Sequence, residues 1–207
     1  MTQQLLKKKK KKWYLIIAAN EFNNIEIGET LLSEPEQGLN KIIVVSLYTL
    51  TNDIKRQNNL ILFKTISTKD NKINTEIIGY TTLSSYVKRQ IRASKSRIEE
   101  SFLCKTKDNI IVRIKPLVPI KYKPKKSVLT ALRKKLKNYL TNAIEKQNYI
   151  DIINSIINFQ MLKDLQNELK KVYPVSNITI KSLAKEEIKG MSEKPEEIKH
   201  TLQEKTI

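Results

Sequence analysis

Residues 110–144 read IIVRIKPLVPIKYKPKKSVLTALRKKLKNYLTNAI, and the hydrophobic period changes within this stretch. From Ile110 to Ile120 the chain is rich in β-branched residues, which is typical of a strand. After Pro124, apolar residues recur at three- and four-residue intervals, the spacing of one helix face. This stripe consists of Leu129, Leu132, Leu136, Leu140 and Ile144. A strand followed by an amphipathic helix predicts an α+β fold.

Other β-branched runs predict further strands that are joined by short turns. Two turns, at 69–72 and 107–109, predict antiparallel hairpins, and Asn109 is expected to adopt the left-handed conformation. The stretch 20–40 has no clear periodicity and contains Gly28, so we expect a loop-rich connector there. The expected strands span 41–48, 59–67, 73–82, 98–106, 110–120 and 177–183.

Further helices are predicted where apolar residues recur at helical spacing. Ser84 or Ser85 is expected to cap a short helix, and Ser127 to cap the helix of the opening stretch. Two more helices are expected at 148–157 and 159–172. Strands followed by a run of helices favour one mixed domain.

Length and composition indicate one core with a polar segment at each end. A chain of 207 residues can bury one hydrophobic core of ordinary size. We expect a flexible basic arm at 1–12, a single α+β domain at 13–184 and a polar tail, solvated or weakly helical, at 185–207. Apolar runs are far shorter than the roughly 20 residues that span a bilayer, and the amino terminus does not fit a signal peptide. We therefore expect a cytoplasmic protein.

The chain carries 39 Lys and Arg against 21 Asp and Glu, a formal charge of +18. A compositional drift toward Ile, Asn and Lys explains abundant lysine, but such a drift leaves the shortage of acids unexplained. Strongly positive surfaces attract polyanions, so nucleic acid is the first partner to consider. The candidate RNA-binding residues are Lys7, Lys8, Lys9, Lys10, Lys11, Lys12, Lys88, Arg89, Arg92, Lys95, Arg97, Lys121, Lys123, Lys125, Lys126, Arg133, Lys134 and Lys137.

The chain's only tryptophan, Trp13, directly follows the basic arm, and Tyr14 comes next. Either ring could stack on an unpaired base or wedge the arm against the core. We favour a core position for Trp13, because the apolar run 15–19 follows it and 13–19 as a whole reads as a short buried segment.

Residue patterns that support catalysis or metal binding are missing from the sequence. The single cysteine, Cys104, excludes an intrachain disulfide and reads as a small core residue. The single histidine, His200, lies in the tail, and the two side chains are too few for a zinc site. No glycine-rich phosphate loop occurs, and Glu99 with Glu100 reads as a solvated pair. We therefore expect no enzymatic activity, metal or cofactor.

Short motifs recur in order along most of the chain. They are KKWYLIIAANEF at 11–22, IGET at 27–30, LTND at 50–53, SRI at 96–98, TKD at 106–108 and VYP at 172–174. Over residues 7–185 the chain thereby resembles a small-subunit ribosomal protein family of archaea and eukaryotes called S-three-Ae, or eukaryotic-type small-subunit protein one. It departs from the family at Asn109, where glycine is usual, at Ala93 and Ser94, which interrupt an arginine run, and at 176–177, where basic residues are common.

The resemblance implies a structural constituent of the small ribosomal subunit, on the platform near the mRNA exit and the 3′ end of the rRNA. It implies a mostly antiparallel, barrel-like twisted sheet with helices packed beside it. The implied partners are small-subunit rRNA, neighbouring small-subunit proteins and mRNA near the exit. A free-standing RNA-binding regulator or RNA chaperone would use the same basic residues. A peripheral membrane protein is less well supported, because Leu5 and Leu6 alone make a small apolar anchor.

Overall fold

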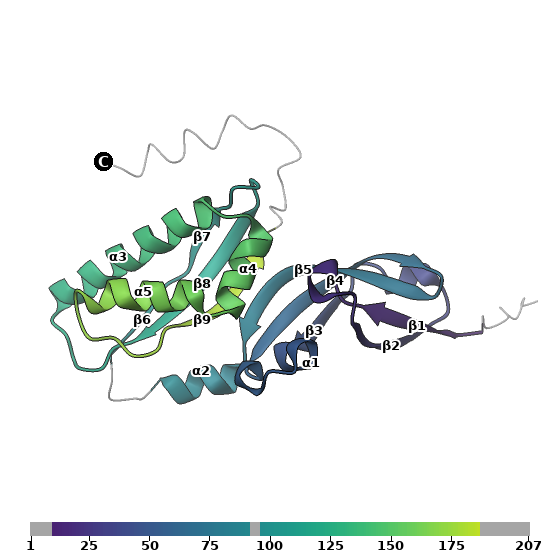
Figure 1. The fold of residues 1–207 in the computed structure, drawn as a ribbon, viewed down its shortest axis with the longest axis horizontal. Coiled ribbons are helices and arrows are strands. Elements are labelled where there is room, and N and C mark those ends of the chain that lie inside the picture. Colours follow the sequence, from purple (N-terminus) through teal and green to yellow (C-terminus); the bar gives the residue numbers. More distant parts are fainter. Residues whose placement is uncertain (1–9, 92–95, 187–207) are drawn as a thin grey trace, which may run out of the picture.

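The computed structural model describes residues 10–91 and 96–186, which form a mixed α+β fold (Figure 1). Within these ranges one sheet has nine strands: β1 (Lys12–Ile17), β2 (Glu26–Leu32), β3 (Ile42–Ser46), β4 (Asn59–Lys69), β5 (Lys72–Thr82), β6 (Arg97–Glu99), β7 (Phe102–Lys105), β8 (Ile111–Pro119) and β9 (Thr179–Lys185). The same ranges hold five α-helices: α1 (Leu47–Thr51), α2 (Ser84–Gln90), α3 (Lys126–Glu145), α4 (Tyr149–Ile157) and α5 (Gln160–Lys170).

The sheet is assembled on β5, which pairs with three other strands. One edge of β5 pairs antiparallel with β4, from Asn59 opposite Thr82 to Lys69 opposite Lys72. The other edge pairs in parallel with β1 at one end and antiparallel with β9 at the other, where Gly79 lies opposite Ala184. β5 therefore belongs to a first half-sheet, β1–β5, and joins it to a second half-sheet, β6–β9 (Figure 1).

The second half-sheet is built on β8. One edge of β8 pairs with β9, and its other edge pairs first with β7 and then with β6. In the described residues the strand path runs from β2 to β6 and has two ends, so the sheet is not closed. The expected barrel-like sheet is thus corrected to an open one. The reason is that β1 and β9 share the same edge of β5, so the sheet branches there.

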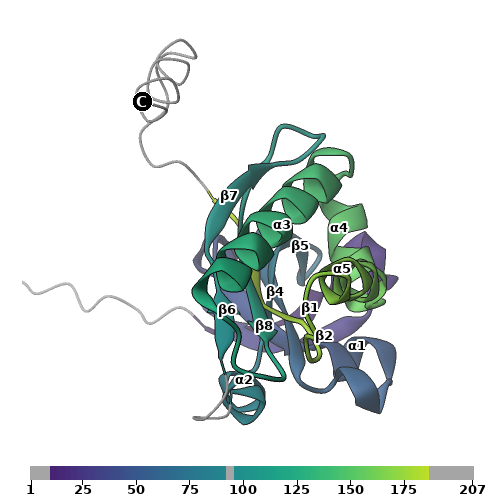
Figure 2. The same ribbon diagram turned by 90° about the vertical axis from the view of Figure 1, so that its left-hand side faces the viewer.

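The helices α3, α4 and α5 pack together beside the second half-sheet (Figures 1 and 2). The predicted apolar stripe of α3 is confirmed, because its last four members are fully buried and Leu129 is partly buried. Each such leucine contributes about 1.5–3 kcal/mol to the stability of the fold. The same core continues into the first half-sheet through Ile61 and Phe63 of β4. In the described part of the chain, no helix is long and apolar enough to cross a bilayer.

Both predicted hairpin turns are confirmed. Asp70 and Asn71 have φ angles of 48° and 61°, as the tight turn between β4 and β5 requires. Asn109 has a φ angle of 61°, so it occupies the left-handed conformation that glycine would also adopt. Cys104 is buried, as predicted, and its Sγ atom lies 3.8 Å from Oγ1 of Thr141.

The predicted connector at 20–40 is wrong, because it contains the strand β2. This strand pairs antiparallel with β1 over nearly its whole length. Most of its side chains are exposed or half-buried, so its sequence lacks the apolar alternation that identifies a strand. The segment forms a strand because it pairs with β1, and its own residue pattern does not indicate this.

Three boundary predictions also need correction. The helices α2 and α3 begin after Leu83 and Lys125, and neither has a side-chain cap, so the predicted serine caps are wrong. The predicted strand 98–106 is broken after Glu99, where its pairing with β8 changes from β6 to β7. Finally, β9 runs to Lys185, so the start predicted for the tail lies inside a strand. Residues 1–9 and 187–207 lie outside the described residues.

Gly79 lets the two half-sheets approach closely. A Cβ atom at this position would lie 2.7 Å from the backbone oxygen of Leu183, in β9. We expect Gly79→Ala to lower the free energy of unfolding by about 1–3 kcal/mol, because the obstacle is backbone and cannot rotate away. Gly28→Ala is the matched control, since no atom lies within 4 Å of its added Cβ. Denaturant unfolding measures both, and equal stabilities of the two variants would contradict the proposed contact.

Candidate nucleic-acid interface

The basic residues predicted at 121–137 lie in the β8–α3 connection and on the solvent side of α3. All seven are exposed, and those on α3 are so because the apolar stripe turns the opposite side of the helix into the core. We call these exposed residues the α3 basic group. Its members are Lys121, Lys123, Lys125, Lys126, Arg133, Lys134 and Lys137.

The start of α3 is the most positive part of this group. Lys125 is the N-cap residue and Lys126 is the first helical residue, while the first turn contains no acid and no side-chain cap. The amino end of a helix already carries partial positive charge and N–H groups without helical partners. Adding lysines there makes the position unfavourable for cations and favourable for a phosphate or another anion.

Ion pairs neutralise part of the basic surface. Nε of Arg133 lies 3.2 Å from Oε1 of Glu100, and Nε of Arg97 lies 3.1 Å from Oε1 of Glu99. Glu99 and Glu100, interpreted from the sequence as a solvated pair, are both partly exposed, and each also faces a cation. Beside the same helix, Glu168 accepts hydrogen bonds from Lys171 and Lys135, which lower the pKa of its carboxyl group.

The predicted basic residues of α2 lie near the start of the α3 basic group. Lys88 and Arg89 are exposed in the last turn of α2. Arg89 and Lys121 both line a recess of about 480 Å³. The backbone nitrogen of Ile120 donates a hydrogen bond of 2.9 Å to the oxygen of Ser96, which holds the neighbouring segments together. The candidates Arg92 and Lys95 lie outside the described residues.

The start of β1, which follows the arm in the sequence, lies at the other end of the elongated molecule (Figure 1). Lys10, Lys11 and Lys12 are exposed, whereas Lys7, Lys8 and Lys9 fall in the undescribed segment. Trp13 is 62% exposed, so the favoured core position is wrong. The reason is the two-residue period of β1, which turns Tyr14 inward at 6% exposure and its neighbour outward. Of the two rings, only Trp13 is accessible for stacking.

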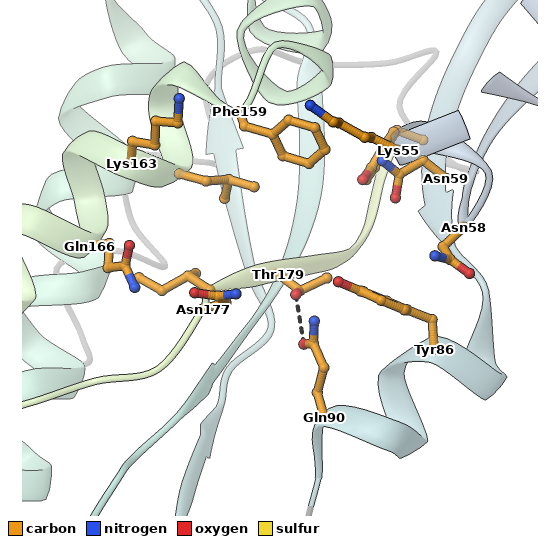
Figure 3. Close-up of a pocket in the computed structure, with 13 residues that line it drawn as sticks. Lys55, Asn58, Asn59, Tyr86, Gln90, Phe159, Lys163, Gln166, Asn177 and Thr179 are labelled. Carbon is orange, nitrogen blue, oxygen red and sulfur yellow. Dashed lines mark hydrogen bonds between the residues drawn. The ribbon is translucent and has the colours of Figure 1, made fainter. Parts of the chain in front are cut away.

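One functional candidate was missed by the sequence analysis. A cavity of about 270 Å³ lies between α2, α5 and the start of β9 (Figure 3). Tyr86 and Phe159 line it, together with several amide side chains. These residues come from segments far apart in the sequence, so no local pattern indicates the cavity. In residues 10–91 and 96–186 no group of three or more His, Cys, Asp or Glu side chains could hold a metal ion.

Comparison with known proteins identifies the family. The model of the Ribosomal S3Ae family matches residues 4–186. The small ribosomal subunit protein eS1 of Methanocaldococcus jannaschii is 30% identical over 181 residues, which cover 87% of this chain and 80% of the relative. The protein of the same name from Nanoarchaeum equitans is 30% identical over 153 residues, covering 74% and 77%. That from Haloquadratum walsbyi is 26% identical over 183 residues, covering 88% and 84%. The chain therefore belongs to the Ribosomal S3Ae family.

Proposed function

We propose that this protein is a structural constituent of the small ribosomal subunit and binds small-subunit rRNA in support of translation. The observation that carries this proposal is the family match over residues 4–186, which spans both half-sheets and the helices. The curated relatives are named as small ribosomal subunit proteins. The proposed role is architectural, with no reaction to catalyse, and places the protein with ribosomes in the cytoplasm.

The lysines of the α3 basic group and the end of α2 form the main proposed rRNA contact. Lysine and arginine side chains that neutralise phosphates release condensed counterions, which supplies affinity for RNA of any sequence. The start of α3 supports this placement, because Lys125 and Lys126 meet the positive end of the helix without a neighbouring acid. Arg97 and Arg133 are secondary contacts, since each already has a carboxylate partner.

The arm makes a second proposed contact, and it precedes the start of β1, which lies at the opposite end of the molecule from α3 (Figure 1). Lys7–Lys12 would thread between rRNA segments, where closely packed phosphates favour a run of cationic side chains. Trp13 follows at the edge of the folded region, and its exposure supports stacking on an unpaired base. Residues 13–184 would act as one unit between the two contacts, because a single core cluster includes residues from both half-sheets.

The proposed position on the subunit is the platform, near the mRNA exit and the 3′ end of the rRNA. Neighbouring small-subunit proteins would cover apolar surface that is exposed in the isolated chain. Ile42 and Val44 on β3 support this, because they are 60% and 53% exposed on adjacent outward positions of one strand. Messenger RNA near the exit would be a further, transient partner.

Neutralising the start of α3 should weaken RNA binding. We expect the combined Lys123→Gln, Lys125→Gln and Lys126→Gln variant to bind a transcript of the 3′ part of small-subunit rRNA about tenfold or more weakly. The slope of log affinity against log salt should fall by about 2–3, because about one counterion is released per phosphate contact. Fluorescence anisotropy at several salt concentrations measures both quantities.

The control for this experiment changes the same number of charges elsewhere. Lys105, Lys107 and Lys146 are exposed near the opposite end of α3. Their combined replacement by glutamine should leave affinity within about twofold of the original protein. Equal losses in the two triple variants would show that net charge alone, and not this surface, determines binding.

Trp13 provides its own optical test, because it is the only tryptophan in the chain. The free protein should show the red-shifted emission of a solvent-exposed indole, since its side chain is largely exposed. Stacking on a base should quench this emission when the rRNA transcript is added. The Trp13→Ala variant should bind more weakly by roughly 5- to 100-fold with little change in melting temperature. Unchanged emission on saturation with RNA would exclude stacking.

Sedimentation of cell extract tests the function as a whole. Following the chain across a gradient at low salt and again after a high-salt wash should find it with the small subunit and with translating ribosomes in both cases. Retention is expected because many separate contacts must break together for release. Release at modest salt, or a position at the top of the gradient, would instead support a free-standing RNA-binding regulator or chaperone.

A further inference from the structure

The cavity between α2, α5 and the start of β9 has the chemistry of a binding site. Its volume of about 270 Å³ is close to the lower end of the range for small-molecule sites, which start near 300 Å³. Such a space suits one planar ring system and no larger ligand. Figure 3 shows Phe159 and Lys55 on one side of the cavity, with Tyr86 and Gln90 on the opposite side. The walls of the cavity therefore come both from the segments that follow β3 and β5 and from the segment that precedes α5.

Three aromatic residues line this cavity: Tyr80 is buried, whereas Tyr86 and Phe159 are half-buried. Tyr86 lies on α2, and the guanidinium carbon of Arg89 is 5.5 Å from the centre of its ring. Phe159 precedes α5 with a φ angle of 58°, a left-handed conformation that is uncommon for residues other than glycine. Strained conformations of this kind cost about 1–3 kcal/mol and cluster at functional sites. In this conformation Phe159 lines the cavity.

Amide side chains supply hydrogen-bonding groups around the rings. Gln90 accepts a hydrogen bond of 2.7 Å from Oγ1 of Thr179, which fixes the amide while leaving its N–H donors for another partner. Gln166 donates a hydrogen bond of 3.0 Å to the backbone oxygen of Ser176, which leaves its oxygen as an acceptor. Asn177 also lines the cavity. Groups that can both donate and accept are suited to the edge of a nucleobase.

The charged residues that line the cavity favour a neutral or anionic ligand. Lys55 and Lys163 line the cavity, and no acidic residue is among the described residues that line it. This excludes a cationic side chain as the favoured occupant. The recess that contains Arg89 and Lys121 adjoins the cavity, because Tyr86, Gln90 and Asn177 line both spaces. The cavity lined by aromatic and amide side chains thus lies next to a recess lined by cations. In a nucleotide, a base lies next to its phosphate in the same way.

We propose that this cavity receives one unpaired nucleobase of a single-stranded RNA segment, while Arg89 and Lys121 contact the adjacent phosphate. The proposal rests on the proposed RNA-binding function. It adds a site that binds an unpaired base and thereby distinguishes single-stranded RNA from duplex RNA. The aromatic rings stack on the base, and the amides hydrogen-bond to its edge. Base-paired RNA cannot enter, because its bases are stacked and their edges are occupied.

The test compares single-stranded and duplex RNA with the full-length protein. The probes are a fluorescent uridine oligonucleotide of about 12 nucleotides and an RNA duplex of about the same length. Two variants remove the rings separately, Tyr86→Ala and Phe159→Gly. The first adds a better helix former to α2, and the second relieves the left-handed strain at Phe159, so both are chosen to retain the fold. Each should weaken single-strand binding about tenfold and leave duplex binding within about twofold.

Tyr48→Ala is the matched control, because Tyr48 is a 45% exposed tyrosine on α1 that does not line the cavity. It should bind both probes like the original protein, and melting curves of all variants verify folding. If the original protein binds single strands and the cavity variants bind them equally well, the cavity proposal is overturned while the proposed function stands. Equal losses for single strands and duplex would also overturn it.

Two other outcomes separate the alternatives. If the original protein binds neither probe nor the rRNA transcript, the proposed function itself fails and the cavity proposal fails with it. If a glutamate polymer binds the original protein, and the cavity variants lose that binding while retaining single-stranded RNA, the cavity takes an acidic peptide instead. Photocrosslinking of 4-thiouridine oligonucleotides to the peptides that contain Tyr86 or Phe159 would directly support the proposed base.

Discussion

The close pairing of β5 with β9 at Gly79 is the contact on which the rest of the structure depends. It joins the two half-sheets through a short antiparallel segment in which Gly79 lies opposite Ala184. Hydroxyl groups reinforce it, since Thr81 and Thr82 donate hydrogen bonds of 3.1 Å and 2.8 Å to backbone oxygens of the β9 strand. An ion pair between Lys185 and Glu76 holds the same two strands where they diverge. The shared core and the cavity both lie between parts of the chain that this pairing brings together.

The same arrangement explains the separation of the basic surfaces. The first half-sheet carries β1, with the exposed Lys12 at its start, at one end of the molecule, and the second half-sheet carries α3 at the other (Figure 1). A folded body between two cationic ends could contact two separate RNA segments at once. The second contact then forms at a high effective concentration, so affinity rises without any new kind of interaction. In the proposed role, an elongated fold is therefore more useful than a closed barrel.

The parts of the fold that were predictable from the sequence are those set by local periodicity. The stripe from Leu129 to Ile144 predicts α3 because helix spacing alone decides which side is buried. The hairpin at Asp70 follows from turn chemistry. The strand β2 was missed because an exposed strand has no apolar alternation, and Trp13 was misplaced because a neighbouring apolar run outweighed the two-residue period. The open sheet and the cavity depend on pairing across long sequence separations, which no local pattern records.

The exposed basic residues differ in what they contribute to the fold itself. The pairs of Arg97 with Glu99 and Arg133 with Glu100 are partly exposed, and such pairs contribute about 0–1 kcal/mol. A phosphate can therefore replace either carboxylate at small cost to stability. Lys125 and Lys126 contribute unfavourably, because they add positive charge to the positive end of α3. Acids or a serine cap at this position would stabilise the isolated helix. In the proposed role, rRNA phosphates would relieve the repulsion that these lysines add.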